Sequence, residues 1–184
     1  MNITLDGFIS GPNCELDWHF KHWSLEMASA LTDELHNADT LLFGSITYRA
    51  MAAYWTSVGV DLTSPVEDRA FAAMMSSYAK IVFSKSNNLP YWKNAMQVKD
   101  EAIAYAKMLK KQDGKPIMIY GSGKLVKDLI KNRLVDEYQL WVHPVAIGKG
   151  KLLFEGGNHN LELIKTQQFR SGVMLFYYRE RQKA

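Results

Sequence analysis

In the segment 117–126, a glycine-rich turn directly follows an apolar run, and a helical pattern begins directly after the turn. It reads Ile-Met-Ile-Tyr-Gly-Ser-Gly-Lys-Leu-Val. A strand that enters a helix through such a turn directs several backbone N–H groups and the positive end of the helix dipole at one point. That point suits a phosphate, so we predict a phosphorylated ligand, with a dinucleotide as the first candidate. Val126 replaces the third glycine of the G-x-G-x-x-G fingerprint, which leaves an ordinary tight turn as the alternative.

Two other apolar runs end in residues of the same kind. Gly44-Ser45-Ile46-Thr47 follows one run, and Ser84-Lys85-Ser86 follows another. A third segment of this kind is Gly121-Ser122-Gly123-Lys124-Leu125-Val126. The three segments provide glycine, hydroxyl and lysine groups at the carboxyl ends of parallel strands, which is where such sheets bind their ligands. Lysine pairs with phosphate as a point charge, while hydroxyl and N–H groups fix its direction. The alternative is that small polar residues simply favour loops.

A few isolated side chains are further candidates for a site. We expect Asp6, which follows the apolar start of the chain, either to orient substrate or a water, or to close a local Asx turn. Trp18 and Tyr48 are candidates for the walls of an aromatic-ring pocket, with core packing as the alternative. The pair His19 and His22 has too few neighbouring ligands to predict a metal site.

Motifs and composition narrow the class of protein. The sequence has no Gly-x-Ser-x-Gly, no Walker lysine–serine pair and no His-Glu-x-x-His, which disfavours acyl transfer, phosphoryl transfer and zinc hydrolysis. A net charge of +3 is too small to argue for nucleic acid, yet it is compatible with an anionic small ligand. The single cysteine, Cys14, permits no intramolecular disulfide, which fits the cytoplasm. No apolar run reaches the roughly 18 residues of a membrane span.

The elements that would position these residues alternate along most of the chain. Spacing of apolar residues by four predicts a helix from about Ser24 to Asn37, and Asp100 is the expected N-cap of a later helix. The Gly- and Pro-containing segments Thr56–Pro65 and Asn87–Trp92 are expected to be loops. The expected strands are Thr40–Phe43, Lys80–Ser84, Ile117–Tyr120, Glu137–Val145, Leu161–Thr166 and Val173–Arg181.

This order of elements predicts the architecture. The early strands alternate with helices, and the last two surround a turn at Arg170-Ser171-Gly172. We therefore expect residues 1–184 to form a single three-layer α/β domain with a mixed, mostly parallel sheet and a C-terminal antiparallel hairpin. Its ligand should lie at the carboxyl ends of the parallel strands.

An ordered set of motifs resembles the dihydrofolate reductase-like family over nearly the whole chain. The closer branch is the reductase domain at the C-terminus of the bifunctional riboflavin-biosynthesis protein. The motifs are Thr4-Leu5-Asp6-Gly7-Phe8-Ile9-Ser10-Gly11, Leu42-Phe43-Gly44-x-x-Thr47-Tyr48, Tyr120-Gly121-Ser122-Gly123, Leu134-Val135-Asp136-Glu137-Tyr138 and Pro144-Val145-x-x-Gly148-x-Gly150-Lys151-x-Leu153-Phe154.

The resemblance implies an NADPH-dependent reductase, often a homodimer. It implies that Gly44–Thr47 meet the pyrophosphate and ribose, that Ser84–Ser86 lie near the adenosine 2′-phosphate, and that Gly121–Val126 cradle the pyrophosphate. It also implies that Asn2 and Ile9 approach the nicotinamide, and it makes Glu155 a second candidate for orienting the substrate.

The chain also departs from the family pattern. Ser45 stands where many relatives carry arginine, so Lys85 or Lys124 must take over the 2′-phosphate, and NADH stays possible. No residue clearly matches the carboxylate that binds the pterin in dihydrofolate reductases.

Two functions follow from these observations. The first is reduction of a small pyrimidine- or pterin-like substrate by NADPH or NADH, as in 5-amino-6-(5-phosphoribosylamino)uracil reductase or dihydrofolate reductase. The second is a non-catalytic nucleotide-binding or dimeric interaction protein on the same scaffold.

Overall fold

The chain forms two compact units in a computed structural model that describes residues 1–99 and 101–181. Unit 1 comprises Met1–Leu31 and Val126–Ala184, and unit 2 comprises Thr32–Leu125. The boundaries fall inside helix α2 (Leu25–His36) and helix α6 (Gly123–Lys131). The single domain expected from the sequence stays a prediction.

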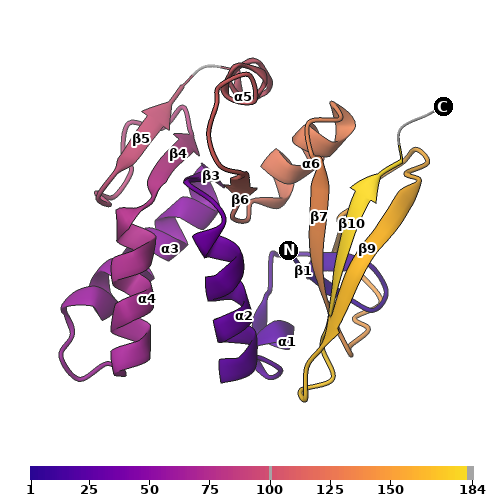
Figure 1. The fold of residues 1–184 in the computed structure, drawn as a ribbon, viewed down its shortest axis with the longest axis horizontal. Coiled ribbons are helices and arrows are strands. Elements are labelled where there is room, and N and C mark those ends of the chain that lie inside the picture. The colour runs from indigo at the N-terminus through magenta and orange to yellow at the C-terminus, as the bar shows by residue number, and fades with distance from the viewer. Residues whose placement is uncertain (100, 182–184) are drawn as a thin grey trace. The chain divides into compact units, whose positions relative to one another are not determined.

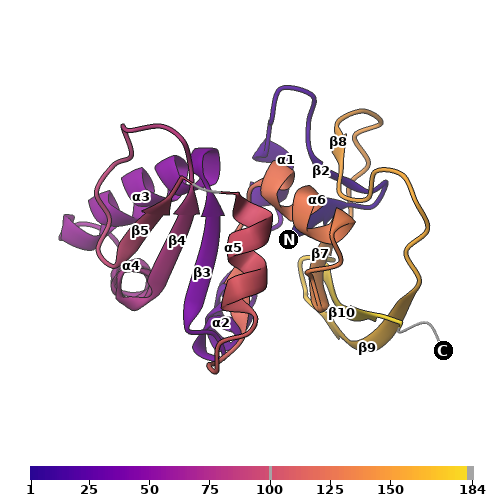
Figure 2. The same ribbon diagram turned by 90° about the horizontal axis from the view of Figure 1, so that it is seen from above.

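Unit 2 is built on a parallel sheet of the order β5-β4-β3-β6. Its strands are β3 (Thr40–Gly44), β4 (Ala79–Phe83), β5 (Ala95–Val98) and β6 (Ile117–Ile119). In the middle of the sheet, Leu42 of β3 is paired with Ile81 of β4 and with Ile119 of β6. Figure 2 shows β5, β4 and β3 side by side and pointing the same way. The predicted strands of this region are confirmed, and their carboxyl ends lie at one edge of the sheet.

The helices of unit 2 correct one prediction. Helix α3 (Ser45–Val60) includes residues 56–60, which had been expected to form a loop, and α4 (Val66–Ser77) follows after a short turn. The Thr56 hydroxyl donates to the Ala52 carbonyl at 2.6 Å, so its polar group is satisfied within the helix. A Cβ at Gly59 would lie 3.7 Å from the Ala72 Cβ, so this glycine brings α3 close to α4. Packing between the two helices overrides the loop-like composition.

Unit 2 also contains a loop between β4 and β5 and a third helix of its own, α5. The loop predicted for Asn87–Trp92 is confirmed, since these residues lie between β4 and β5. Helix α5 (Ala102–Leu109) has Glu101 at its N-cap position, and Asp100, the expected cap, lies outside the described residues.

Unit 1 contains a mixed sheet of the order β1-β7-β10-β9. Strand β1 (Asn2–Thr4) runs parallel to β7 (Glu137–His143), whereas β10 (Met174–Glu180) is antiparallel to both β7 and β9 (Leu161–Gln168). Figure 1 shows the hairpin of β9 and β10 beside β7. The helix α1 (Asp17–Phe20) and the two-stranded sheet of β2 (Phe8–Ser10) and β8 (Lys151–Leu152) also belong to this unit.

A buried cluster packs on the sheet of unit 1. The stacked rings of Trp141 and Phe169 lie 5.3 Å apart between centroids, and Met27 of α2 joins them in the cluster. The predicted α/β fold with a parallel sheet and a C-terminal antiparallel hairpin is confirmed. In the described part of the chain, no helix has the length and apolar character that a bilayer crossing requires.

Candidate functional site

Three strand ends of unit 2 meet at the carboxyl edge of its sheet. β3 ends at Gly44 and leads directly into α3, β4 leads into Ser84-Lys85-Ser86, and β6 leads through Tyr120 into the turn that begins at Gly121. Because β3 lies between β4 and β6 and all three are parallel, these segments are neighbours. The structure therefore brings together the three segments that the sequence singled out.

The loops after β3 and β6 are in close contact. A Cβ added to Gly44 would lie 2.1 Å from the Ser122 Oγ, and one added to Gly121 would lie 2.6 Å from the Thr47 Cγ2. Gly121 and Ser122 both have positive φ, at +81° and +75°. Larger residues at either glycine would force the two loops apart, so the glycines allow the backbone at this edge to pack closely.

The turn after β6 presents free backbone donors. The amides of Gly121, Ser122 and Gly123 donate no hydrogen bond to any other residue within the described ranges. Helix α6 begins at Gly123, so the positive end of its dipole lies at the same place. Successive N–H groups in such a turn form an anion-binding concavity. This arrangement fits the pyrophosphate of a nicotinamide nucleotide, the group that the sequence implied, and Lys124 adds an exposed cation.

The end of β4 contains a functional candidate that sequence reasoning missed. Arg49 of α3 donates from Nη2 to the Ser86 Oγ at 2.9 Å. The residues predicted at the end of β3 include Ser45, which directly follows Gly44, but not Arg49. Residues four apart lie on one face of a helix, so Arg49 shares its face with Ser45. Helical spacing from Ser45 was the signal that could have found it.

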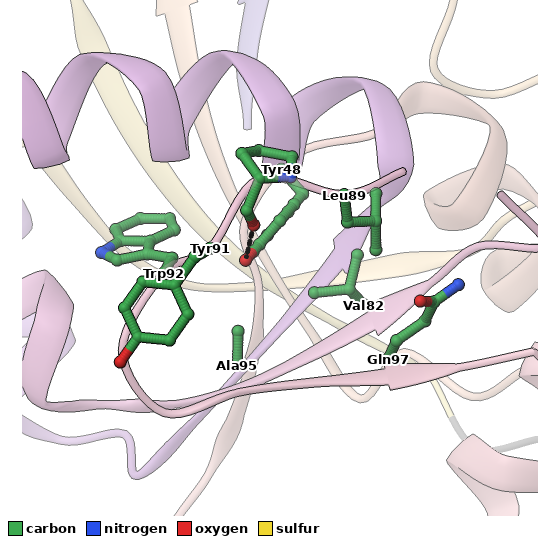
Figure 3. A pocket seen from close by; sticks show the side chains of 8 residues that line it. Tyr48, Val82, Leu89, Tyr91, Trp92, Ala95 and Gln97 are labelled. Atoms are coloured by element: carbon green, nitrogen blue, oxygen red, sulfur yellow. Dashed lines mark hydrogen bonds between the residues drawn. The ribbon is translucent and has the colours of Figure 1, made fainter. Parts of the chain in front are cut away.

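Tyr48, a predicted wall of the substrate pocket, lies on α3 and faces a small hollow of unit 2. It lines a hollow of about 120 Å³ together with Val82 of β4 and Gln97 of β5 (Figure 3). Its hydroxyl donates to the Pro90 carbonyl at 2.9 Å, the contact that Figure 3 marks with a dashed line. Burial raises the pKa of Tyr48, so the phenol is a neutral donor that is already engaged. A role in the substrate pocket stays a prediction.

Trp18 packs in unit 1 against a buried histidine. Its ring meets His143 edge-on with 5.3 Å between centroids, and His143 is fully buried. The His143 Nε2 bonds to the Asn2 Oδ1 at 3.0 Å. Within residues 1–99 and 101–181, neither the Trp18 Nε1 nor the His143 Nδ1 has a hydrogen-bond partner. Asn2 and the buried Ile9, both predicted to approach the nicotinamide, lie on β1 and β2 of this unit.

The electrostatics of His143 keep it neutral. Burial first, and then the charges of the neighbouring His19 and His22 rings and of the N-terminal amine, lower its pKa from 6.5 to about 4. Each of the two rings lies 5.9 Å from the His143 ring between centroids. The imidazole therefore carries no charge near neutral pH, and with Nε2–H donating to Asn2 its Nδ1 is a bare acceptor.

The two carboxylates predicted to orient a substrate are both engaged. Asp6 accepts from the Thr4 hydroxyl at 2.6 Å and from the Gly148 and Ile147 amides at 2.8 and 3.1 Å. The Thr4 bond and then these amides lower the pKa of Asp6, so it is a stable anion that joins two turns of unit 1. Glu155 forms an ion pair with Lys127. Catalytic roles for both stay predictions.

Comparison with known proteins identifies relatives along the full length of the chain. Residues 1–175 match the model of the RibD C-terminal domain. YyaP of Bacillus subtilis, whose function is uncharacterized, is 34% identical over 178 residues, which is 96% of this chain and 90% of YyaP.

Solved structures share the fold. A protein of Shewanella sp. PV-4 with a provisional riboflavin-biosynthesis name aligns at a TM-score of 0.72 with 19% identity, covering 99% of this chain and 97% of that one. The deaminase/5-amino-6-(5-phosphoribosylamino)uracil reductase of Thermotoga maritima aligns at 0.61 with 15% identity, covering 98% of this chain and 55% of the Thermotoga chain.

Proposed function

The chain belongs to the family of the RibD C-terminal domain, and on that premise we propose that it reduces a small pyrimidine- or pterin-like substrate with NADPH. The observation that carries this proposal is the meeting of three parallel strand ends around a turn with free amide donors. NADH remains the second candidate for the cofactor. The substrate class rests on the name of the Thermotoga relative, a uracil reductase.

The nucleotide is assigned to named residues of the chain. The amides of Gly121, Ser122 and Gly123 hold the pyrophosphate, and the N-terminus of α6 and Lys124 neutralise its charge. Thr47 lies in contact range of the same turn and supplies a hydroxyl for the ribose. When bound, the nicotinamide supplies the hydride, and the protein supplies position and electrostatics. For the nicotinamide end, Asn2 and Ile9 stay the residues that the family resemblance implies.

The engaged carboxylates favour a second candidate function. Asp6 is held by three donors and Glu155 by Lys127, so no free carboxylate is available to orient a substrate among these predicted residues. A non-catalytic nucleotide-binding protein on the same scaffold would need only the phosphate-binding edge. An assay of NADPH oxidation in the presence of a reducible pyrimidine distinguishes the two functions. A reductase oxidises NADPH in this assay, whereas a non-catalytic nucleotide-binding protein binds NADPH without oxidising it.

Thermal denaturation with and without nucleotide tests the proposal. A ligand that binds only the native state stabilises it by mass action. At a concentration of about 100 times its Kd, it raises the free energy of unfolding by about 2.7 kcal/mol, and the melting temperature rises as a result. We expect NADPH to raise the melting temperature of the wild type. If neither NADPH nor NADH shifts it at millimolar concentration, the proposal fails.

A pair of variants on one helix localises the binding. Lys124→Glu places a negative charge beside the proposed pyrophosphate site, and Lys131→Glu makes the same charge change at the other end of α6. We expect the first to weaken NADPH binding about tenfold and the second to leave it nearly unchanged, because exposed charges interact weakly beyond about 10 Å. Equal effects of both variants would contradict the assignment.

A further inference from the structure

Unit 2 contains a second hollow, which the proposed reaction does not use. It measures about 270 Å³ and is formed by the last turns of α3, by α4 and by the residues just before β5. Ser76 and Lys93, which line it, come shortly before the first residues of β4 and β5. The hollow therefore lies at the amino ends of these strands, on the side of the sheet opposite to the strand ends described above.

Aromatic side chains form much of the wall of this hollow. They are Trp55 of α3 and the neighbouring residues Tyr91 and Trp92. Trp92 is buried and donates from Nε1 to the Ser76 Oγ at 3.1 Å, so its ring is fixed, whereas Tyr91 is 86% exposed. Figure 3 shows both residues, because they also line the smaller hollow of this unit. Aromatic walls of this kind favour a planar ring that stacks on them or meets them edge-on.

The charged groups that line the hollow are cations. Arg69 of α4 and Lys93 belong to its wall, and none of the described residues that line it is acidic. The buried Lys80 lies close by, with its Nζ 4.8 Å from the centroid of the Trp92 ring. Burial lowers the pKa of Lys80 to about 8, so it still carries its charge at neutral pH. Asp61 offsets part of the charge of Arg69, and the remaining positive charge favours an anionic ligand.

Several hydrogen-bond donors in the wall are available to an anion. The printed contacts of the Ser76 hydroxyl use it as an acceptor from Trp92, which leaves its own proton to donate. The Arg69 Nη1 donates to the carbonyls of Leu62 and Ser64, and the other donors of the planar guanidinium stay available. Such a guanidinium matches a carboxylate, which accepts two parallel bonds from it.

We propose that this hollow binds a small planar aromatic carboxylate. The ring of the ligand lies against Trp55, Tyr91 and Trp92, and its carboxylate faces Ser76, Arg69 and Lys93. Aromatic walls alone would also suit a quaternary ammonium ion, but the cations of this hollow repel such a ligand. The hollow has room for one or two fused rings. This inference does not depend on the proposed reduction, because none of its residues belongs to the edge assigned to the nucleotide.

Calorimetric titration with three compounds separates the contribution of the ring from that of the charge. 2-Naphthoate has a planar ring and a carboxylate, 2-naphthamide has the same ring without the charge, and cyclohexanecarboxylate has the charge on a ring that is not planar. We expect the wild type to bind 2-naphthoate about tenfold more tightly than either of the other two. NADPH should not displace 2-naphthoate, because its proposed site lies at the opposite edge of the sheet.

Substitutions of exposed residues locate the binding without disturbing the core. We expect Lys93→Gln and Tyr91→Leu each to weaken 2-naphthoate about three- to fivefold, while Tyr91→Phe keeps the ring and the affinity. Lys107→Gln removes an exposed lysine of α5, which does not line the hollow, and serves as the matched control. It should leave the titration unchanged.

Four results would overturn the inference. The first is no binding of 2-naphthoate at millimolar concentration, and the second is equal affinity for 2-naphthoate and 2-naphthamide. The third is displacement of 2-naphthoate by NADPH, or an unchanged affinity in both Lys93→Gln and Tyr91→Leu, since either would place the compound elsewhere on the protein. The fourth is a dimer in sedimentation that Tyr91→Leu converts to a monomer, because a second copy of the chain would then cover the hollow.

Discussion

The buried, neutral His143 should make the stability of this protein depend on pH in a way that one substitution removes. Its pKa is about 4 in the folded protein, against 6.5 without the burial and the neighbouring His19 and His22 rings. Between these values the unfolded chain binds a proton at His143 that the native state does not bind. Stability therefore falls as the pH is lowered through this range, and below the lower pKa the loss is complete.

The size of the effect follows from the gap between the two pKa values. At about 1.4 kcal/mol per pKa unit, the whole gap corresponds to about 3 kcal/mol, of which about 2 kcal/mol is already lost at about pH 5. His143→Gln removes the titrating group and keeps a side chain that can bond to Asn2. When the pH is lowered from about 7.5 to about 5, we expect the wild type to lose about 2 kcal/mol more in free energy of unfolding than the variant loses.

Urea unfolding at both pH values measures this difference directly. Comparing wild type with variant at each pH cancels the acid titration of carboxylates such as Asp6 and Glu162, which both proteins share. His36→Gln removes an exposed histidine at the end of α2 and serves as the matched control. A stability difference between wild type and His143→Gln that is the same at both pH values would refute the account of His143 as a buried neutral imidazole.

Two further substitutions test the packing around the strand ends. Gly121→Ala should cost about 2 kcal/mol in urea unfolding, because it places a Cβ 2.6 Å from the Thr47 Cγ2 at a backbone φ of +81°. Thr47→Ser in the same chain should recover part of this loss, and a Gly121→Ala variant as stable as the wild type would contradict the close contact. Tyr48→Phe should cost about 1 kcal/mol, because the Pro90 carbonyl loses its donor at 2.9 Å, and an unchanged unfolding midpoint would show that water replaces the hydroxyl without penalty.

The meeting of three strand ends at one edge of the sheet could be predicted from the sequence because its signals are local. Each strand is a short apolar run, and each is followed at once by glycine, serine or lysine, as at Gly44 and Ser84. Once the strands are parallel, these ends meet at one edge regardless of the details of the helices. The same locality made the turn at Gly121 visible, since a strand, two glycines and a helix follow one another within ten residues.

The features that the sequence did not reveal depend on contacts between distant segments. Arg49 was missed because its bond to Ser86 depends on the helical phase of α3. Part of that helix has the composition of a loop, and its helical conformation depends on the packing of Gly59 against Ala72. The bond between Asn2 and His143 joins residues 141 positions apart, and it exists only because β1 pairs with β7. Composition alone indicates neither bond, and only the helical spacing from Ser45 could have pointed to Arg49.

The tight fit between position 44 and Ser122 has a consequence for engineering this scaffold. A methyl group at position 44 would occupy the place of the Ser122 hydroxyl, so the acceptable residue in one loop depends on the residue in the other. A chimera that takes the segment after β3 from a relative with a side chain at this position should misfold locally unless the segment after β6 is exchanged with it. The two loops therefore have to be grafted, recombined or randomised as a single module.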